Sequence, residues 1–183
     1  MNRDSKNKLL TAGAIALGLT ALTLVSCSKR SIPTGVTAVQ PFDFDKYLGS
    51  WYEIARFDFR FERGLDHTTA TYTKNEDGTI KVVNRGYNTK KGKWKTATGK
   101  AKFAGSKEEA MLKVSFFGPF YAGYNVIAID PEYKYALVSG DSRDYLWILS
   151  REKTLPANIK RDYVAKAKSL GFDTEKLLWI AQN

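Results

Sequence analysis

The fold is decided by a short run in the middle of the chain, Met111-Leu112-Lys113-Val114-Ser115-Phe116-Phe117. Large apolar side chains at 112, 114 and 116 alternate with Lys113 and Ser115. Successive side chains of a β-strand point to opposite faces of its sheet. The run therefore predicts a strand with one apolar and one polar face.

Segments of similar composition lie on both sides of this run. They are rich in aromatic and β-branched residues, and turn-forming residues separate them, as in an all-β barrel or sandwich. Short connections such as 75–78 and 91–92 favour antiparallel neighbours. We predict an all-β fold, an eight-stranded antiparallel up-and-down β-barrel, with strands near 50–57, 68–74, 80–87, 94–103, 111–117, 121–129, 135–139 and 145–150.

Alternation also assigns an inside to the other strands. Tyr145, Trp147 and Leu149 share one face of the last strand, as Leu112, Val114 and Phe116 do in the fifth, and both faces are predicted to line the interior. In 94–103 the apolar parity changes near Gly99, which predicts a β-bulge there.

The barrel has helical additions at both ends. Residues 42–48 form one expected helical turn, capped by Asp43 or Asp45, that plugs something apolar. From Thr154 to Gly171 the apolar period becomes helical, which predicts a C-terminal α-helix. Residues 177–180 are then predicted to form a short ninth strand beside the barrel.

The N-terminus has the form of a lipoprotein signal peptide. Basic residues precede an uncharged apolar segment over 9–25, and the small Ser26 comes directly before Cys27. A retained transmembrane helix is the alternative. The motif resembles the lipobox, which implies that Cys27 is acylated and cleavage occurs before it. In the proteins that it resembles, an aspartate after the cysteine favours the inner membrane, so Ser28 points to the outer membrane.

Three parts of the chain follow from these patterns: a signal peptide over 1–26, an acylated N-terminus and tether over 27–41, and one barrel domain over 42–183. The net charge is +10, and removal of three basic and one acidic residue with the signal peptide leaves +8. Cys27 is the only cysteine, so its acylation excludes an internal disulfide.

Three local sequences resemble the lipocalin family, and the wider segments 61–64, 116–121 and 144–151 resemble its bacterial outer-membrane members specifically. Gly49-Ser50-Trp51-Tyr52 matches the Gly-x-Trp signature of the first strand, Arg143-Asp144-Tyr145 resembles the second signature, and Arg151 stands at the arginine of the third. The resemblance extends from about Phe42 to Ile180. It implies that Gly49, Trp51, Asp144 and Arg151 are structural, with Arg151 lying across the Trp51 ring in a cation–π pair.

An eight-stranded barrel can hold one small ligand, lipocalins being a standard example. The predicted lining is apolar and aromatic, which suits an acyl chain. The resemblance implies a fatty acid or lysophospholipid, bound, stored or transported at the periplasmic face of the outer membrane. The candidate contacts are Tyr121 and Trp147 first, then Tyr145, Leu149, Leu112, Val114 and Phe116.

Basic residues could hold an anionic head group near the rim, from Arg56, Arg60, Arg63 and the lysines between Lys90 and Lys102. A solvated basic surface is the alternative for any single one. The charge would also draw the domain toward anionic lipids. Nucleic acid is not expected, because no binding motif accompanies the charge.

We predict no enzymatic activity, no cofactor and no metal site. The lone His67 has no cysteine partner and no ligand spacing typical of zinc. The competing interpretation is a non-catalytic structural or interaction protein of the cell envelope, with a filled barrel that binds a partner protein. The sequence leaves a homodimer open.

Overall fold

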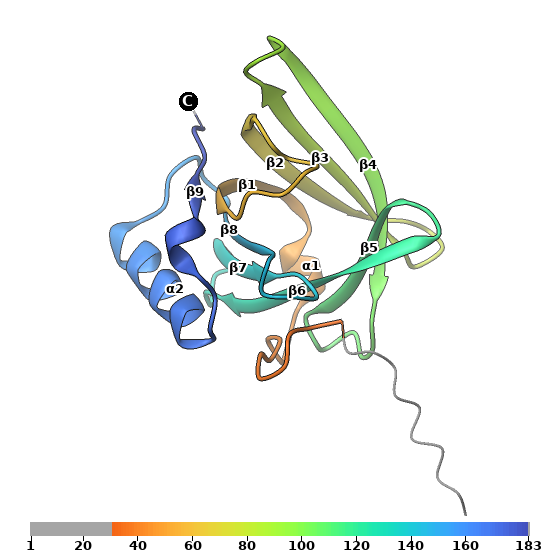
Figure 1. Cartoon of the computed structure of the whole chain (residues 1–183). Helices are drawn as coiled ribbons and strands as arrows, with labels where there is room; N and C mark the ends of the chain where they lie inside the picture. Colours follow the sequence, from red (N-terminus) through yellow and green to blue (C-terminus); the bar gives the residue numbers. More distant parts are fainter. Residues whose placement is uncertain (1–30, 183) are drawn as a thin grey trace, which may run out of the picture.

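A computed structural model describes residues 31–182 of the chain (Figure 1). The predicted signal peptide and Cys27 lie outside the described residues. The elements, in order, are α1 (Phe44–Tyr47), β1 (Gly49–Arg56), β2 (Leu65–Lys74), β3 (Ile80–Asn88), β4 (Lys93–Phe103), β5 (Met111–Phe117), β6 (Phe120–Ile129), β7 (Tyr135–Ser139), β8 (Leu146–Ser150), α2 (Ala157–Ser169), a 3₁₀ turn (Thr174–Lys176) and β9 (Leu178–Trp179).

The strands form a closed antiparallel barrel. Each of β2 to β8 pairs with the next strand along the chain, and β1 closes the ring by pairing with both β8 and β2. The short β9 pairs with the C-terminal end of β1, at Ala55 and Arg56. The predicted eight-stranded up-and-down barrel, its C-terminal helix and its ninth strand are all confirmed.

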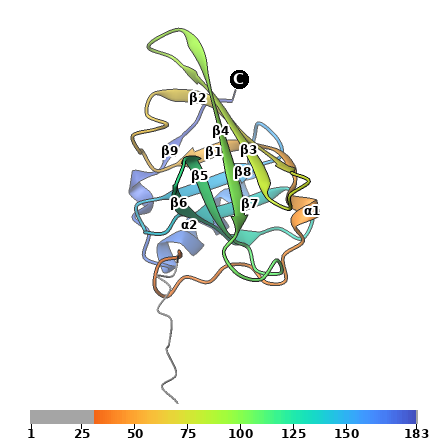
Figure 2. The same ribbon diagram turned by 90° about the vertical axis from the view of Figure 1, so that its right-hand side faces the viewer.

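The two ends of the barrel differ. The helix α1 and the connections 75–79, 104–110 and 130–134 gather at one end, which we call the closed end. The connections 57–64, 89–92, 118–119 and 140–145 gather at the other, which we call the mouth. Figure 2 shows α1 at the right of the barrel and the β3–β4 hairpin projecting at the top, away from α1.

Two apolar cores fill the molecule. The first occupies the barrel interior and includes Trp51, Tyr72 and Leu112. The second lies between the outer wall of the barrel and α2, where Tyr163 and Ala167 pack with residues of β6, β7 and β8. Burial of the apolar stripe of α2 against the wall explains why this 13-residue helix is stable.

A register shift in β1 places two charged residues inside the barrel. The pairing of β1 with β8 slips between Glu53 and Ala55. Glu53 faces inward with Trp51, whereas Ala55 belongs to the outer core and Arg56 returns to the interior. An extra residue in one strand has this effect on side-chain direction, because it reverses the alternation.

The predicted bulge at Gly99 is wrong. β4 pairs with β3 without a register shift from Ala101 to Lys93, so 95, 97, 99, 101 and 103 all face inward and Trp94 faces outward. Gly99 is needed for another reason. A β-carbon there would lie 2.7 Å from the Ser115 carbonyl oxygen and 2.8 Å from the Phe116 ring, so close packing excludes a side chain.

The expected tether differs from the structure after Ser31. Ile32 and Val36 are buried in the outer core. Val39 is bonded through its backbone to Val126 and Ala110 on the barrel. The segment 31–41 therefore forms a packed belt, because its apolar side chains join the outer core and its backbone bonds to the barrel.

Candidate ligand-binding site

The closed end is sealed by an aromatic plug. Asp43 caps α1 by accepting from the backbone N–H groups of Asp45 and Lys46, as predicted. The fully buried Trp51 donates its Nε1 hydrogen to the Tyr47 carbonyl at 2.9 Å, and the Arg151 guanidinium carbon lies 3.8 Å from the centroid of its ring. The predicted cation–π pair is confirmed.

Arg151 also joins the backbone of the closed end. Its nitrogens donate to the carbonyls of Lys46 (2.8 Å), Leu48 (2.9 Å) and Ser50 (2.8 Å), and of Tyr133 at 3.3 Å. Gly49 has a φ of 92°, and a β-carbon there would lie 3.4 Å from Arg151 Nη1. A left-handed backbone that approaches the guanidinium accounts for glycine at this position.

Three tyrosine hydroxyls form the floor of the interior above this plug. The Tyr124 hydroxyl lies 2.6 Å from that of Tyr47 and 2.7 Å from that of Tyr72. Burial raises the pKa of all three, so they stay neutral. The three hydroxyls satisfy one another without introducing a charge into the apolar interior.

Small side chains line the interior toward the mouth. Ala101, at the closed end of β4, is fully buried, Gly99 and Ala97 are partly exposed, and Lys95 is exposed, although all four face inward. Ala70 and Ala122 face them from β2 and β6. Inward-facing residues can keep contact with solvent only where the interior is open, so the barrel opens toward its mouth.

Aromatic rings surround this opening. The Trp147 and Tyr145 rings are stacked with centroids 6.2 Å apart, and the Phe59 ring meets both edge-on, at 5.6 and 5.8 Å. Trp147 and Phe116 are partly exposed. These rings offer flat apolar surface where an acyl chain would enter.

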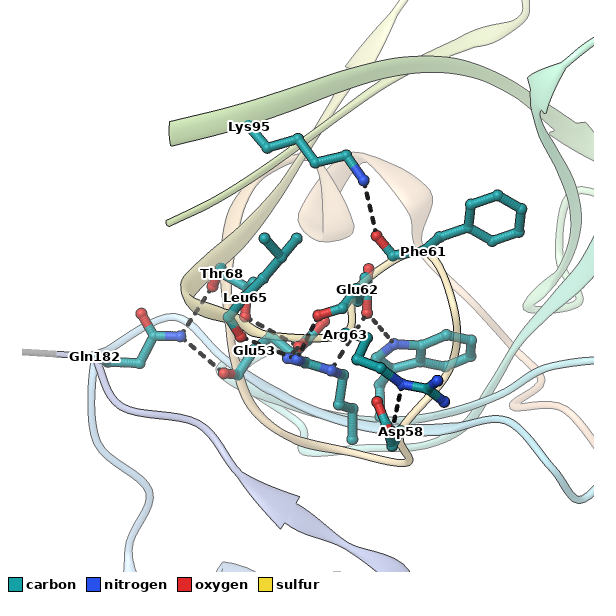
Figure 3. A network of polar contacts seen from close by, with 11 residues as sticks. Glu53, Asp58, Phe61, Glu62, Arg63, Leu65, Thr68, Lys95 and Gln182 are labelled. Atoms are coloured by element: carbon teal, nitrogen blue, oxygen red, sulfur yellow. Dashed lines mark hydrogen bonds and ion pairs between the residues drawn. The ribbon is translucent and has the colours of Figure 1, made fainter. Parts of the chain in front are cut away.

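A buried polar network ties the 57–64 loop to the barrel (Figure 3). Arg56, 2% exposed, donates to Glu53 Oε1 at 2.5 Å and to the carbonyls of Glu62 and Leu65. Trp147 Nε1 donates to Glu62 Oε2 at 3.3 Å, and Lys95 Nζ donates to the Phe61 carbonyl at 3.0 Å. The loop is therefore fixed beside the mouth from three sides.

The carboxyl groups of this network are shifted by their surroundings. Burial raises the pKa of Glu62 well above its usual value, and the neighbouring Glu53 carboxylate raises it further, against the Arg56 charge. Burial also raises the pKa of Glu53. One arginine thus serves buried Glu53 and largely buried Glu62, which favours a shared proton over two full charges.

Most of the candidate lining residues occupy the interior together. Leu112 and Leu149 are buried in the interior core, and Val114, Phe116 and Trp147 pack against it. Tyr145 stands at the mouth and is 36% exposed. Tyr121 lies apart, because its neighbour Tyr124 points inward and the Lys102 ammonium lies 4.8 Å from the Tyr121 ring on the outer wall.

The predicted basic rim is only partly assembled. Arg56 is enclosed by the buried network, and Arg63 is paired with Asp58 at 2.9 Å. Arg60 stacks over the exposed Phe61 ring. Lys95 faces the inside of the mouth and is therefore the cation best placed for a head group.

His67 lies on the outer wall, in a hollow of about 520 Å³ that it shares with Arg85, Trp94 and Lys153. Its φ is 51°, within the register shift of β2. The Arg85 guanidinium carbon lies 4.0 Å from the Trp94 ring centroid.

Asp144 lies in the connection before β8, where it accepts a hydrogen bond from the Ser142 hydroxyl at 3.0 Å.

Within residues 31–182 no group of three potential metal ligands comes together. None of the helices described there is long and apolar enough to cross a membrane.

Comparisons with known proteins agree with this geometry. The profile of the lipocalin-like domain matches residues 42–182, so the chain belongs to the lipocalin family. It is 54% identical, over 92% of its length and 95% of the relative, to the outer membrane lipoprotein Blc of Escherichia coli K12. Blc of Vibrio cholerae is 46% identical, over 92% of this chain and 98% of that protein. The chain is accordingly an outer-membrane lipoprotein of this family.

Solved structures with low sequence identity share the fold. The cockroach allergen Per a 4 matches with a TM-score of 0.66 at 20% identity, over 84% of this chain and 96% of that one. Insecticyanin of the tobacco hornworm matches with a TM-score of 0.65 at 24% identity, over 82% and 86% of the two chains.

The sequence interpretation missed the buried network. Glu53 and Arg56 interrupt an apolar strand, but in a regular strand they point to opposite faces, and nothing in the sequence revealed the register shift that brings them together. The small inward-facing residues of β4 were also missed. The sequence pattern assigned 94, 96 and 98 to the interior, whereas the structure places 95, 97 and 99 there.

Proposed function

We propose that the chain binds and transports a fatty acid or lysophospholipid inside its barrel, anchored through acylated Cys27 at the periplasmic face of the outer membrane, and catalyses no reaction. The observation that carries this proposal is the gradient of exposure along the interior. Inward-facing apolar residues change from fully buried Ala101 to partly exposed Ala97 and Phe116. An apolar interior that opens to solvent suits an acyl chain.

The energetics allow tight binding. A chain of about 16 methylenes at about 0.8 kcal/mol each gives a gross gain of roughly 13 kcal/mol. Association and ordering cost several kcal/mol of this. A micromolar or lower Kd is the expected net result.

The polar groups of the interior suit a ligand with one anionic end. Lys95 would meet a carboxylate or phosphate at the mouth, while the chain extends toward the tyrosine floor. Asn84 faces the interior opposite Ala70 and Ala97, and its Oδ1 has no hydrogen-bond partner among the described residues. This oxygen could accept a hydrogen bond from a hydroxyl group of the ligand.

The buried acids support binding without catalysis. Glu53 accepts from Arg56 and from the Thr68 hydroxyl at 3.0 Å, and Glu62 accepts from Trp147. Both carboxyl groups are held by fixed donors, so their role is to position the loop.

Calorimetric titration of the delipidated soluble chain, residues 28–183, tests the proposal. Palmitate and a lysophosphatidylethanolamine should each bind saturably at one site. Trp147→Ala should weaken binding about tenfold or more, equivalent to about 1.4 kcal/mol. The matched control is Trp179→Ala, because Trp179 is 44% exposed on β9 outside the barrel.

Lys95→Met should weaken the binding of palmitate more than the binding of uncharged hexadecanol. No saturable lipid binding by the folded, delipidated wild type would contradict the proposal and favour the filled-barrel alternative. Equal affinity of the Trp147→Ala and Trp179→Ala variants would remove Trp147 from the site.

A further inference from the structure

The described chain begins beside the mouth. The Ser31 carbonyl accepts from Asn125 Nδ2 at 2.7 Å, and a β-carbon on Gly123 would overlap that carbonyl. Three residues on, the Thr34 carbonyl accepts from Arg143 Nη2 at 2.7 Å, and Arg143 belongs to the 140–145 connection at the mouth. The belt then runs along the barrel to α1 at the closed end.

The length of chain before Ser31 limits how the barrel can face a membrane. Cys27 is four residues before Ser31, and an extended chain spans at most about 3.6 Å per residue, or about 14 Å. Gly123 and Ile129 are six residues apart on β6, so the closed end lies about 20 Å further along the strand. An acyl group on Cys27 therefore brings the mouth within reach of the lipid surface before the closed end.

The exposed aromatic residues lie at the same end. Phe120 is 78% exposed, Phe117 66% and Phe61 51%, and the Phe61 and Phe117 rings lie 5.7 Å apart. Of the eight large apolar residues exposed in the described part of the chain, six lie toward the mouth end of the barrel, with Trp94 and Tyr121 on its outer wall, and two lie on β9. Adjacent exposed aromatic rings of this kind mark an interaction surface, and a bilayer interface accommodates them.

The two ends of the barrel also differ in charge, since the closed end is acidic and the mouth is more basic. The connections and helix at the closed end, 43–48, 75–79, 104–110 and 130–134, contain eight acidic and three basic residues. The mouth connections contain five basic and four acidic residues, one of them the largely buried Glu62, and Lys93 and Lys95 stand next to them. An anionic lipid surface attracts the mouth and repels the closed end.

We propose that the mouth rim, defined by Phe61, Phe117, Phe120 and Tyr121 with the lysines of the β3–β4 hairpin, docks onto the anionic membrane surface that holds the lipid anchor. A ligand would then pass between the membrane and the barrel interior without crossing water. This rests on the acylation of Cys27 proposed above.

The test uses the processed, full-length lipoprotein in vesicles of phosphatidylethanolamine and phosphatidylglycerol. An environment-sensitive fluorophore is attached through Phe120→Cys at the mouth or, as the matched control, Glu76→Cys at the closed end. Acylated Cys27 offers no competing thiol. Mass spectrometry of the N-terminal peptide first establishes acylation, so absence of the acyl groups contradicts the anchor rather than the orientation.

With the anchor established, nitroxide-labelled lipid should quench the reporter at position 120 several-fold more than the reporter at position 76. Equal quenching, stronger quenching at 76, or none at either site would overturn the proposal. The same reporter on residues 28–183, without vesicles, should stay exposed to solvent. If it is completely shielded from solvent there, the rim is covered by a second copy of the chain, and the membrane proposal is overturned.

Discussion

The replacement of Arg151 by lysine tests how the closed end is held. The guanidinium donates to four backbone carbonyls, three of them at 2.8–2.9 Å, while it stacks on Trp51. Lysine keeps the charge but has no planar fork, so it can serve one or two of these acceptors. A hydrogen bond to a charged group contributes about 1.5–3 kcal/mol, and the partial exposure of Arg151 reduces that.

We therefore expect Arg151→Lys to lower the free energy of unfolding by about 2–4 kcal/mol. At about 2–4 °C per kcal/mol for a chain of this size, Tm should fall by roughly 4–16 °C. Urea unfolding of residues 28–183, followed by circular dichroism, measures the change. The control is Arg161→Lys, because exposed Arg161 on α2 pairs with its neighbour Asp162, and such pairs contribute little.

The cation–π part can be separated in a double-mutant cycle with Trp51→Phe. The coupling energy between Arg151→Met and Trp51→Phe should be about 0.5–2 kcal/mol. If Arg151→Lys unfolds at the same urea concentration as Arg161→Lys, the arginine is not the link that the geometry describes.

Three further predictions follow from the buried network, the close approach at Gly99 and the N-terminal cysteine. Folded-state pKa values of Glu53 and Glu62 above the unfolded value near 4.3 mean that stability is fully present below that pH and falls as pH rises toward the folded pKa. In the Glu62→Gln variant, the urea midpoint of unfolding should decline less between pH 4 and 8 than in the wild type. An equal decline in both proteins would show that the pKa of Glu62 does not change on folding. Gly99→Ala should cost about 1–3 kcal/mol by overpacking against Ser115 and Phe116, whereas Gly105→Ala, with no neighbouring atom closer than 4.0 Å, should be nearly neutral; equal effects in thermal melts would contradict the packing argument. Cys27→Ala should abolish incorporation of labelled palmitate, and incorporation that persists in the variant would rule out Cys27 as the attachment point.

The sequence was sufficient for the barrel because several strands, such as 111–117, show a clear alternation of their own. The period of two in 111–117, the short turns and the cap at Asp43 depend on neighbouring residues only, and the structure confirms each. The Trp51–Arg151 pair could also be predicted, since the family signatures mark both positions.

Long-range contacts explain what could not be predicted. The packing of Phe116 over Gly99 joins β5 to β4, and the Tyr124 hydroxyl joins β6 to Tyr47 of α1 and to Tyr72 of β2. The composition of 27–41, poor in large apolar residues, predicts a tether, yet Ile32 and Val36 fix residues 31–41 on the outer core. Tyr121 was assigned to the interior group by its chemistry, whereas strand parity places it on the outer wall.

The central claim is that an acyl chain occupies the barrel interior. The most direct measurement is a nuclear Overhauser experiment on residues 28–183 bound to ¹³C-labelled palmitate. The account predicts contacts from the methylene chain to Ala97, Val114 and Trp147, and from the carboxylate end to residues near Lys95. Contacts confined to the outer wall at Tyr87 and Trp94, or none to the interior, would contradict it.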